Sequence, residues 1–467
     1  MTVVRLPGSP DRAQPPLVQR HRRHAPQQAP CPHCGCPGRR KALRRRTVRT
    51  LAYRAIAWVH VTTGEYRARC GCCRTFRTDV PGIAPRARYD NQVREAVLDR
   101  LLDDRMSLAQ IRNALRRDFY LEVSEGFLYD CLDWKTRQLD GAAYRQWARA
   151  HFSGTLCLDE IHLGRQTLLL ATDPRNDFPV AFAVVSVNDR DHMGRFLRQL
   201  RDGGLVPRVV VTDGSPLYPS LLAALWPQAE HQLCLFHVLR DLHAAVLRAV
   251  RRIARVGQAK GRGGRKRRGG KPSANRLWRR RQAKHKGIAS RLRKKAYLFV
   301  KHPARLTAAE SRELAGLLGY HPQLPVLRSF VVALPRLFAA GQTEAAAWRK
   351  QAALLAEPAY HAIAELAAAL RMVADKFGKM IAFVRSGVGR RVRTNNHVER
   401  MNRLLRLYEK TRYHWRTART KVRFVCLLID RRWGAKVRCW HGQGAGGGAT
   451  AVPGPARAVD PAQEQAA

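Results

Sequence analysis

Acidic residues are scarce in this 467-residue chain: 35 Asp and Glu stand against 86 Lys and Arg, so that the formal net charge is +51. A field of this size and sign favours a polyanion as partner, and nucleic acid is the first candidate. A general abundance of Arg explains part of the excess, but it does not explain why acids are so few. We therefore predict that the protein binds nucleic acid.

Long apolar runs are also missing. No uninterrupted apolar segment reaches the roughly 18 residues that a membrane-spanning helix needs, so we expect no membrane partner. The first residues, MTVVRLPGSPDRAQPP, contain no apolar signal-peptide core, so we do not expect secretion either. In an intracellular protein the 11 cysteines are metal ligands or reduced core residues rather than disulfides.

Regular patterns are absent from both ends of the chain. Residues 1–30 are rich in Pro, Arg and Gln without periodicity, which predicts a flexible arm. Residues 441–467 include GAGGGATAVPGPARA, which predicts a disordered tail. Between them, a chain that is 45 % hydrophobic and this long predicts three or more folded domains.

Residues 31–85 carry two cysteine pairs with metal-ligand spacing. Cys31 and Cys34 form one CxxC pair, and Cys70 and Cys73 form a second. Each pair places two sulfurs on one tight turn, which suits tetrahedral Zn²⁺, and the intervening WVHVTTGEYRAR alternates like a hairpin with Thr-Gly at its turn. We predict a zinc ribbon, in which Cys72 is an alternative to Cys73 as the fourth ligand.

Residues 86–150 have a helical pattern. Ser107 precedes the amphipathic LAQIRNALRRDF, and Ser124 precedes EGFLYDCLDWKTRQL, so each serine is placed to cap a helix. Two short helices in succession predict a helix-turn-helix DNA-binding domain, although any small three-helix bundle gives a similar pattern.

Residues 151–250 predict three strands in succession, then a helix, a strand and a helix. The first strand, TLCLD, ends at Asp159, and the fourth, RVVVTD, ends at Asp213. This is the order of a ribonuclease-H-like core, in which the first and fourth strands are neighbours. Carboxylates at the ends of neighbouring strands lie in the crevice where open α/β sheets bind ligands.

The rest of the chain predicts a long interruption of this core. Residues 251–295 hold 20 Lys or Arg and no acid, which predicts a basic linker that lies along a DNA backbone. Residues 296–385 are rich in Ala and Leu and predict an all-helical insertion. Residues 386–440 then predict the C-terminal helices of the core, which carry Glu399.

Three carboxylates are candidates for one metal site, although each has a simpler explanation. Asp213 could begin an Asp-Gly turn, Glu399 could complete a capping box with Asn396, and Asp159 could merely end a strand. Together, two strand-end Asp and a helix-borne Glu are the ligands that a pair of Mg²⁺ or Mn²⁺ ions needs for phosphoryl transfer. Other acids that compete with them stand in loop-like contexts: Asp173, Asp177, Asp189 and Asp191.

These residues resemble the DDE-type transposases of bacterial insertion sequences. Asp159, Asp213 and Glu399 match the acid triad of that family, and TNNHVERMNRLLR is similar to its final motif, with Asn402 after the Glu. QLCLFHVLRD, with Cys234 and His237, is similar to the Cys-x-x-His segment of Mutator-like transposases. For these two side chains we expect structural support of Asp213, because a metal role would require two further ligands.

The resemblance implies a multidomain α/β transposase that binds the terminal inverted repeats of its element, hydrolyses the DNA there and joins the ends to a target. It further implies Mg²⁺ or Mn²⁺ on the triad, a homodimer or larger assembly on double-stranded DNA, and a bacterial cytoplasm, close to the nucleoid. Two alternatives stay open: a non-catalytic regulator or decayed transposase, and a metal nuclease or resolvase. The arginines expected to contact DNA phosphates are Arg400, Arg403, Arg406, Arg412, Arg416 and Arg419.

Overall fold

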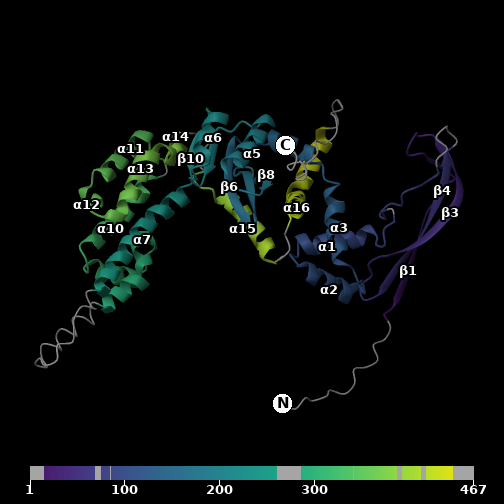
Figure 1. Ribbon diagram of the computed structural model, residues 1–467, viewed down its shortest axis with the longest axis horizontal. Coiled ribbons are helices and arrows are strands. Elements are labelled where there is room, and N and C mark those ends of the chain that lie inside the picture. Colours follow the sequence, from purple (N-terminus) through teal and green to yellow (C-terminus); the bar gives the residue numbers. More distant parts are fainter. Residues whose placement is uncertain are drawn as a thin grey trace, which may run out of the picture. The chain divides into compact units, whose positions relative to one another are not determined.

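A computed structural model gives the fold of the chain, which is of the mixed α/β class (Figure 1). It describes residues 15–68, 75–84, 86–259, 286–339, 341–385, 392–411 and 417–444. The chain divides into two compact units: a first unit of Met1–Tyr144 with Leu404–Ala467, and a second unit of Arg145–Arg403. Among the described residues, no helix combines the length and the apolar character needed to cross a membrane.

A five-stranded sheet forms one part of the first unit, in the order β1-β4-β3-β2 with β5 paired to β4. Its core is made of small apolar clusters, one of which joins Val48, Val59 and Val61 to Val80 and Ile83. The strands are β1 (Leu17–His24), β2 (Gln28–Pro30), β3 (Pro37–Arg49), β4 (Ile56–Ala68) and β5 (Thr75–Arg77).

Two expectations about this sheet were wrong. Residues 17–30 are not a flexible arm, because β1 pairs in parallel with β4 and β2 pairs with β3. Residues 58–68 do not form a hairpin but belong to the single strand β4, whose antiparallel partner is β3. A tight hairpin turn requires positive φ, and Gly64 is not among the residues with positive φ. Gly64 instead leaves room for the Tyr66 side chain, because a Cβ at this position would lie 2.3 Å from the Tyr66 hydroxyl oxygen and 2.5 Å from its ring.

Three helices follow in the first unit, α1 (Asn91–Leu102), α2 (Leu108–Phe119) and α3 (Glu125–Thr136). Both capping predictions are confirmed: the Ser107 hydroxyl accepts from the Gln110 amide in a capping box, and Ser124 accepts from the Phe127 amide. Tyr120 ends α2 in the left-handed region, with φ of 49°, which reverses the chain toward α3.

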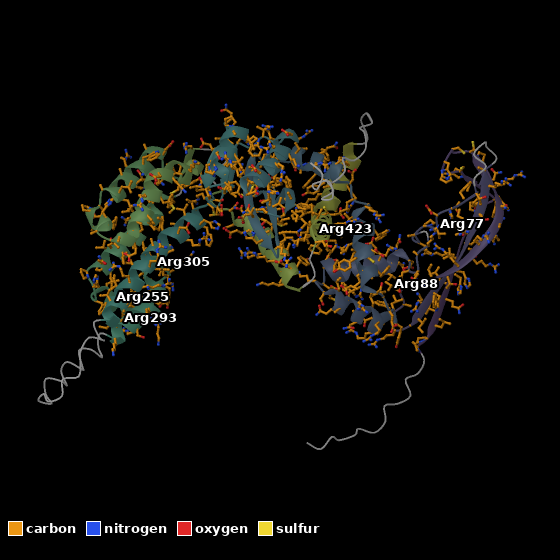
Figure 2. The ribbon with its side chains drawn as sticks, in the orientation of Figure 1. Arg77, Arg88, Arg255, Arg293, Arg305 and Arg423 are labelled. Carbon is orange, nitrogen blue, oxygen red and sulfur yellow. The ribbon has the colours of Figure 1, made fainter. Side chains whose placement is uncertain are left out.

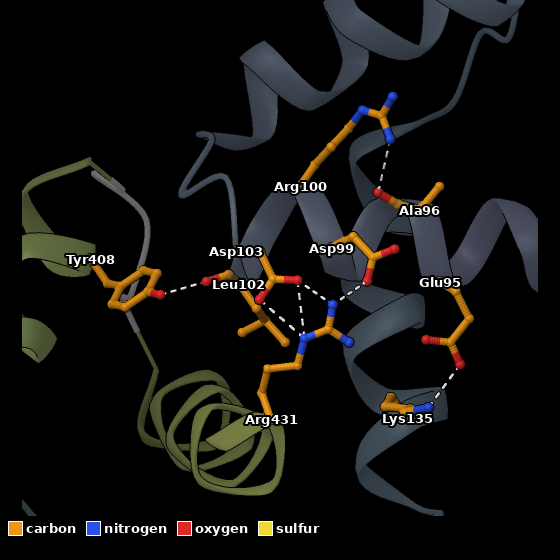
Figure 3. A network of polar contacts seen from close by, with 9 residues as sticks. All are labelled: Glu95, Ala96, Asp99, Arg100, Leu102, Asp103, Lys135, Tyr408 and Arg431. Atoms are coloured by element: carbon orange, nitrogen blue, oxygen red, sulfur yellow. Dashed lines mark hydrogen bonds and ion pairs between the residues drawn. The ribbon is translucent and has the colours of Figure 1, made fainter. Parts of the chain in front are cut away.

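The C-terminal helix α16 (Ala418–Gly444) belongs to this first unit, which corrects the expectation that it completes the core. Figure 3 shows why: Arg431 of α16 is paired with Asp99 of α1 and with Asp103 directly after it, and the Tyr408 hydroxyl donates to the Leu102 carbonyl. Arg423 of α16 is likewise paired with Asp133 of α3.

Removing the Tyr408 hydroxyl should destabilise the first unit. Tyr408 is buried, and its hydroxyl is the partner of a carbonyl at the end of α1 (Figure 3). Tyr408→Phe leaves that carbonyl without its donor, which costs about 1–3 kcal/mol of unfolding free energy. Denaturant titration would measure the loss. A Tyr53→Phe control, at an exposed tyrosine, should change stability by less than about 0.5 kcal/mol; equal effects would contradict the assignment.

The second unit contains a second five-stranded sheet, in the order β10-β9-β6-β7-β8. As expected, the first and fourth strands of this segment, β6 and β9, are neighbours and parallel, whereas β6, β7 and β8 are antiparallel in succession. The strands are β6 (Thr155–Leu163), β7 (Gln166–Asp173), β8 (Phe178–Val185), β9 (Val209–Thr212) and β10 (Glu230–Leu233). Its helices include α4 (Gly141–Ala150, which begins in the first unit), α5 (Arg190–Asp202) and α6 (Tyr218–Leu225).

The predicted helical insertion is present and shares one apolar core with α7 (Leu235–Ala259), around which its helices gather in Figure 1. Residues 251–259 thus continue a packed helix, and residues 286–294 are helical as well, so the expected basic linker is narrower than 251–295; residues 260–285 lie outside the described part. The insertion consists of short 3₁₀ turns and of α9 (Ala308–Leu318), α10 (Gln323–Leu337), α11 (Glu344–Leu355), α12 (Pro358–His361), α13 (Ala367–Met380) and α14 (Ala382–Arg385).

Candidate active site

Two aspartates of the second unit lie at corresponding positions of neighbouring strands. The last residue pair of the parallel β6–β9 ladder is Cys157 with Val211, so Asp159 and Asp213 each stand two residues beyond it. Contrary to expectation, β6 does not end at Asp159 but continues to Leu163, because it stays paired with β7. Asp213 follows directly after β9, as expected, and both side chains are half-buried.

The helix α15 (Asn396–Thr411) brings the third acid to this sheet. Asn395, just before the helix, is fully buried and donates from Nδ2 to the Leu158 carbonyl at 2.7 Å. Asn402 donates from Nδ2 to Asp159 Oδ2 at 2.7 Å. Glu399 lies three residues before Asn402, hence on the same side of the helix. These bonds hold the first two turns of α15 against β6.

The charges of the three acids influence one another. Burial raises the pKa of Asp159 to about 7, and the negative charges of Glu160, Asp213 and Glu399 add to the rise. One oxygen of Glu399, Oε1, is buried and has no hydrogen-bond partner within the described structure. A divalent cation among these carboxylates would supply the missing partner and offset their repulsion. The donor set therefore fits Mg²⁺ or Mn²⁺.

The competing explanations of the three acids fare differently. Asp213 does begin a turn: its Oδ1 accepts from the Ser215 amide at 2.9 Å, and Gly214 has φ of +97°. Only Oδ1 takes part in the hydrogen bond of this turn; the second carboxylate oxygen, Oδ2, does not. Glu399 is not the capping-box partner of Asn396, because Asn396 is itself the first residue of α15.

The other acids that the sequence left open have structural tasks. Asp173 is fully buried and accepts hydrogen bonds from Ser153, Arg175 and Asn176. Asp189 caps α5 by accepting from the His192 amide. Asp177 accepts from His397 at 2.7 Å and from Arg400 at 3.3 Å. Asp191 is exposed in the first turn of α5.

Cys234 and His237 lie beside Glu399, whereas we expected them beside Asp213. Cys234 immediately precedes α7, and its Sγ accepts from the Asn395 amide at 3.1 Å. His237 Nε2 is 3.7 Å from Glu399 Oε1, which is an ion-pair distance but too long for a hydrogen bond. The link to Asp213 is indirect, because the Cys234 amide donates to the carbonyl of Thr212.

Two residues of this neighbourhood escaped the sequence analysis. Asn395 joins β6, Cys234 and α15, yet in the sequence it is merely one of two adjacent asparagines. Tyr218 is fully buried and donates its hydroxyl to Glu160, the acid next to Asp159. The only available signal was the Asn-Asn pair ahead of Glu399; nothing in the sequence indicates that Tyr218 of α6 reaches β6.

Several other site residues were placed in part. The turn at Cys31–Cys36 is formed, with the Gly35 amide donating to the Cys31 carbonyl at 2.8 Å, but Cys70, Cys72 and Cys73 lie outside the described residues. Arg403, Arg406 and Arg419 are exposed, and Arg412 and Arg416 lie outside the described part.

A cavity of about 520 Å³ in the first unit is rich in arginine and aromatic residues. The Arg49 guanidinium lies 4.8 Å from the Trp58 ring centre, and its Nη2 donates to the Tyr120 carbonyl at 2.8 Å. On α3, by contrast, the exposed side chains are those of the acids Glu125 and Asp130. The cavity is lined by Thr47, Arg49, Trp58, Arg88, Tyr89, Arg116, Tyr120, Leu121 and Glu122.

Asn402→Ala should lower the affinity for Mg²⁺ about 10–100-fold, the usual effect of losing a residue that hydrogen-bonds to a metal ligand and orients it. Without the 2.7 Å bond from Asn402, Asp159 can turn away from the position that a cation requires. Mg²⁺-dependent thermal stabilisation would report the affinity. Asn396→Ala, at an exposed position of the same helix, serves as the control and should leave the affinity unchanged. An affinity within twofold of the original protein in Asn402→Ala would contradict this role.

The fold and the site thus define a mixed α/β protein with half-buried aspartates on neighbouring strands and a glutamate on a helix held against one of them. A family model described as a transposase matches residues 156–420, more than half of the chain and a stretch that contains all three acids. The chain belongs to this family, the ISL3 group of insertion-sequence DDE transposases. No curated protein sequence matches the chain.

Proposed function

We propose that the protein cuts DNA at the ends of an insertion sequence and joins the released 3′-OH ends to target DNA. The observation that carries this proposal is the hydrogen bond between Asn402 and Asp159. It holds the helix of Glu399 against β6, and β6 lies beside β9, the strand that ends just before Asp213. The strand order β8-β7-β6-β9-β10, with the first three strands antiparallel and the last two parallel to β6, supports a ribonuclease-H-like core.

Asp159, Asp213 and Glu399 would hold a pair of Mg²⁺ or Mn²⁺ ions. When bound, such a pair activates the attacking oxygen of water or of a 3′-OH and stabilises the leaving oxygen of the phosphodiester. The chain contributes the positions of the three carboxylates. Asn402 orients Asp159, the Ser215 amide orients Asp213, and His237 stands beside Glu399. No side chain forms a covalent intermediate in this scheme.

DNA binding would use both units. In the first unit, Arg49, Arg88 and Arg116 of the cavity can contact phosphates, while its tryptophan and tyrosines offer stacking surfaces. The exposed acids of α3 disfavour that helix as a reader of a negatively charged major groove, although its place after α2 is that of a recognition helix. In the second unit, Arg255, Arg293 and Arg305 are exposed toward one end of the helical insertion (Figure 2).

The Mg²⁺ affinity should rise with pH, because the pKa of Asp159 is raised to about 7 and its proton must leave before a cation binds. Below pH 7 we expect the affinity to fall about tenfold per pH unit, and above pH 8 to level off. The stability of the metal-free protein should change with pH in the opposite direction. Between pH 3.8, the ordinary pKa, and about 7, Asp159 is protonated in the folded state but ionised in the unfolded state, so the free energy of unfolding declines as pH rises through this window. Mg²⁺ titrations at pH 6, 7 and 8 test this; equal affinities would contradict it.

One assay tests the function as a whole. The protein is incubated with labelled element ends, a target plasmid and Mg²⁺, beside the Glu399→Gln variant. Joined products from the unaltered protein alone support a transposase. Cutting without joining indicates a nuclease or resolvase, and binding without cutting indicates a regulator; either would overturn the proposal.

A further inference from the structure

A second group of potential metal ligands adjoins the three carboxylates, and its chemistry differs. Cys234, His237 and Glu399 each offer one ligand atom, and these atoms all lie within 4.8 Å of one another. Cys234 and His237 come from the start of α7, whereas Glu399 comes from the first turns of α15. Sulfur and imidazole nitrogen are donors for Zn²⁺ and similar ions, while Mg²⁺ prefers oxygen.

The spacing suits a tetrahedral ion. Zn–S bonds of about 2.3 Å and Zn–N or Zn–O bonds of about 2.0–2.2 Å place neighbouring ligand atoms roughly 3.3–3.8 Å apart. His237 Nε2 and Glu399 Oε1 are already 3.7 Å apart. The other ligand atoms of the group lie within 4.8 Å of one another, so a shift of about an ångström at most, which side-chain rotation can supply, brings them to this spacing. Three protein ligands would leave the fourth position to water.

One ligand atom of this group lacks a hydrogen bond. Glu399 Oε1, which lies 3.7 Å from His237 Nε2, is buried and has no hydrogen-bond partner within the described structure. Such an atom is costly unless a ligand, ion or water satisfies it. The Cys234 sulfur accepts from the Asn395 amide and precedes a helix N-terminus, and both features stabilise a thiolate. Burial raises the pKa of Cys234, so an incoming ion has to displace its proton.

We propose that Cys234, His237 and Glu399 form a binding site for a thiophilic divalent ion such as Zn²⁺, and that the ion takes Glu399 away from the Mg²⁺ site. Glu399 is a ligand in both arrangements, and its carboxylate cannot serve both fully at once. Zn²⁺ would then be an inhibitor of the transposase, acting at the catalytic carboxylate. The binding claim depends on the geometry of the three side chains; the inhibition claim rests in addition on the proposed function.

Binding is tested with Co²⁺, whose thiolate and imidazole complexes are coloured, on the full-length protein. The N-terminal cysteines also take up Co²⁺, so the measured quantity is the difference between variants. His237→Gln and Cys234→Ser should each lose one equivalent of Co²⁺ and the corresponding part of the thiolate charge-transfer band. Cys426→Ser, a half-buried cysteine of α16, is the control and should lose neither. Unchanged stoichiometry in both test variants would overturn the proposal.

Two further measurements test whether the variants fold correctly and separate the claim of metal binding from the claim of inhibition. His237→Gln leaves the bond of the Cys234 sulfur to Asn395 in place, so it should keep the circular dichroism spectrum of the original protein. Asp213→Asn should weaken Mg²⁺ binding but keep the Co²⁺ equivalent, since Asp213 is not in this group. If Co²⁺ binds as expected but no DNA is cut, the proposed function fails and the site stands. If DNA is cut and Zn²⁺ leaves the Mg²⁺ affinity unchanged, the inhibition claim fails.

Discussion

Glu399→Gln should lower both DNA cleavage and DNA joining by more than about a hundredfold, since loss of a residue that merely orients a metal ligand already costs about 10–100-fold. The amide keeps the size of the side chain but removes the charge that a pair of cations needs. The affinity for DNA ends should stay within about twofold, because the positive field of the chain is untouched. Single-turnover assays with labelled ends would measure cleavage and joining separately from binding.

The control for this variant is another acid-to-amide change in the same unit. Asp191→Asn removes a charge from an exposed position in the first turn of α5. It should leave cleavage and joining unchanged. Comparable losses in the two variants would show that net charge, rather than a specific ligand, controls the activity.

DNA affinity should fall steeply with salt, by about 10³–10⁵-fold between 50 and 200 mM if six to ten phosphates are contacted. The physical reason is release of the counterions that the DNA holds before arginine and lysine replace them. A chain with 86 basic and 35 acidic residues can supply such a number of contacts. Fluorescence anisotropy with a labelled end, at several salt concentrations, gives the slope; a flat dependence would contradict a phosphate-based interface.

The cavity of the first unit makes this prediction specific. Replacing Arg88 and Arg116 with Ala should reduce the slope of log affinity against log salt by about 1 for each phosphate contact that is lost. Arg117→Ala, on the same helix as Arg116, is the matched control, because Arg117 is already bonded to Asp118 at 2.7 Å. If the control changes the slope as much as the double variant does, the cavity is not a phosphate site.

Local patterns predicted local structure well. The Ser107 and Ser124 caps, the strand ending before Asp213 and the neighbouring β6 and β9 strands are all present, because each depends on short-range chemistry or on strand order. The transposase family was also recognised correctly from the acids and the motif around Glu399.

The failures have a common physical origin in long-range pairing. Residues 17–30 were predicted to be part of a flexible arm, but residues 17–24 form a strand that pairs with β4. Gly64 looked like a turn residue, yet it lies inside β4 and pairs with Leu43 of β3. The helix α16 was assigned to the core, but Arg431 meets Asp99 and Asp103, more than 300 residues earlier in the chain. No local pattern encodes such partners.

Convergence of the three acids on shared metal ions is tested most directly by replacing Mg²⁺ with Fe²⁺ and mapping where locally generated hydroxyl radicals cut the protein backbone. A His237→Gln variant would keep Fe²⁺ away from the cysteine-containing group. Cuts near residues 159, 213 and 399, all suppressed together by excess Mg²⁺, are the predicted result. Cuts near 159 and 213 without any near 399 would mean that Glu399 does not reach the ions, and the assignment of the active site would be wrong.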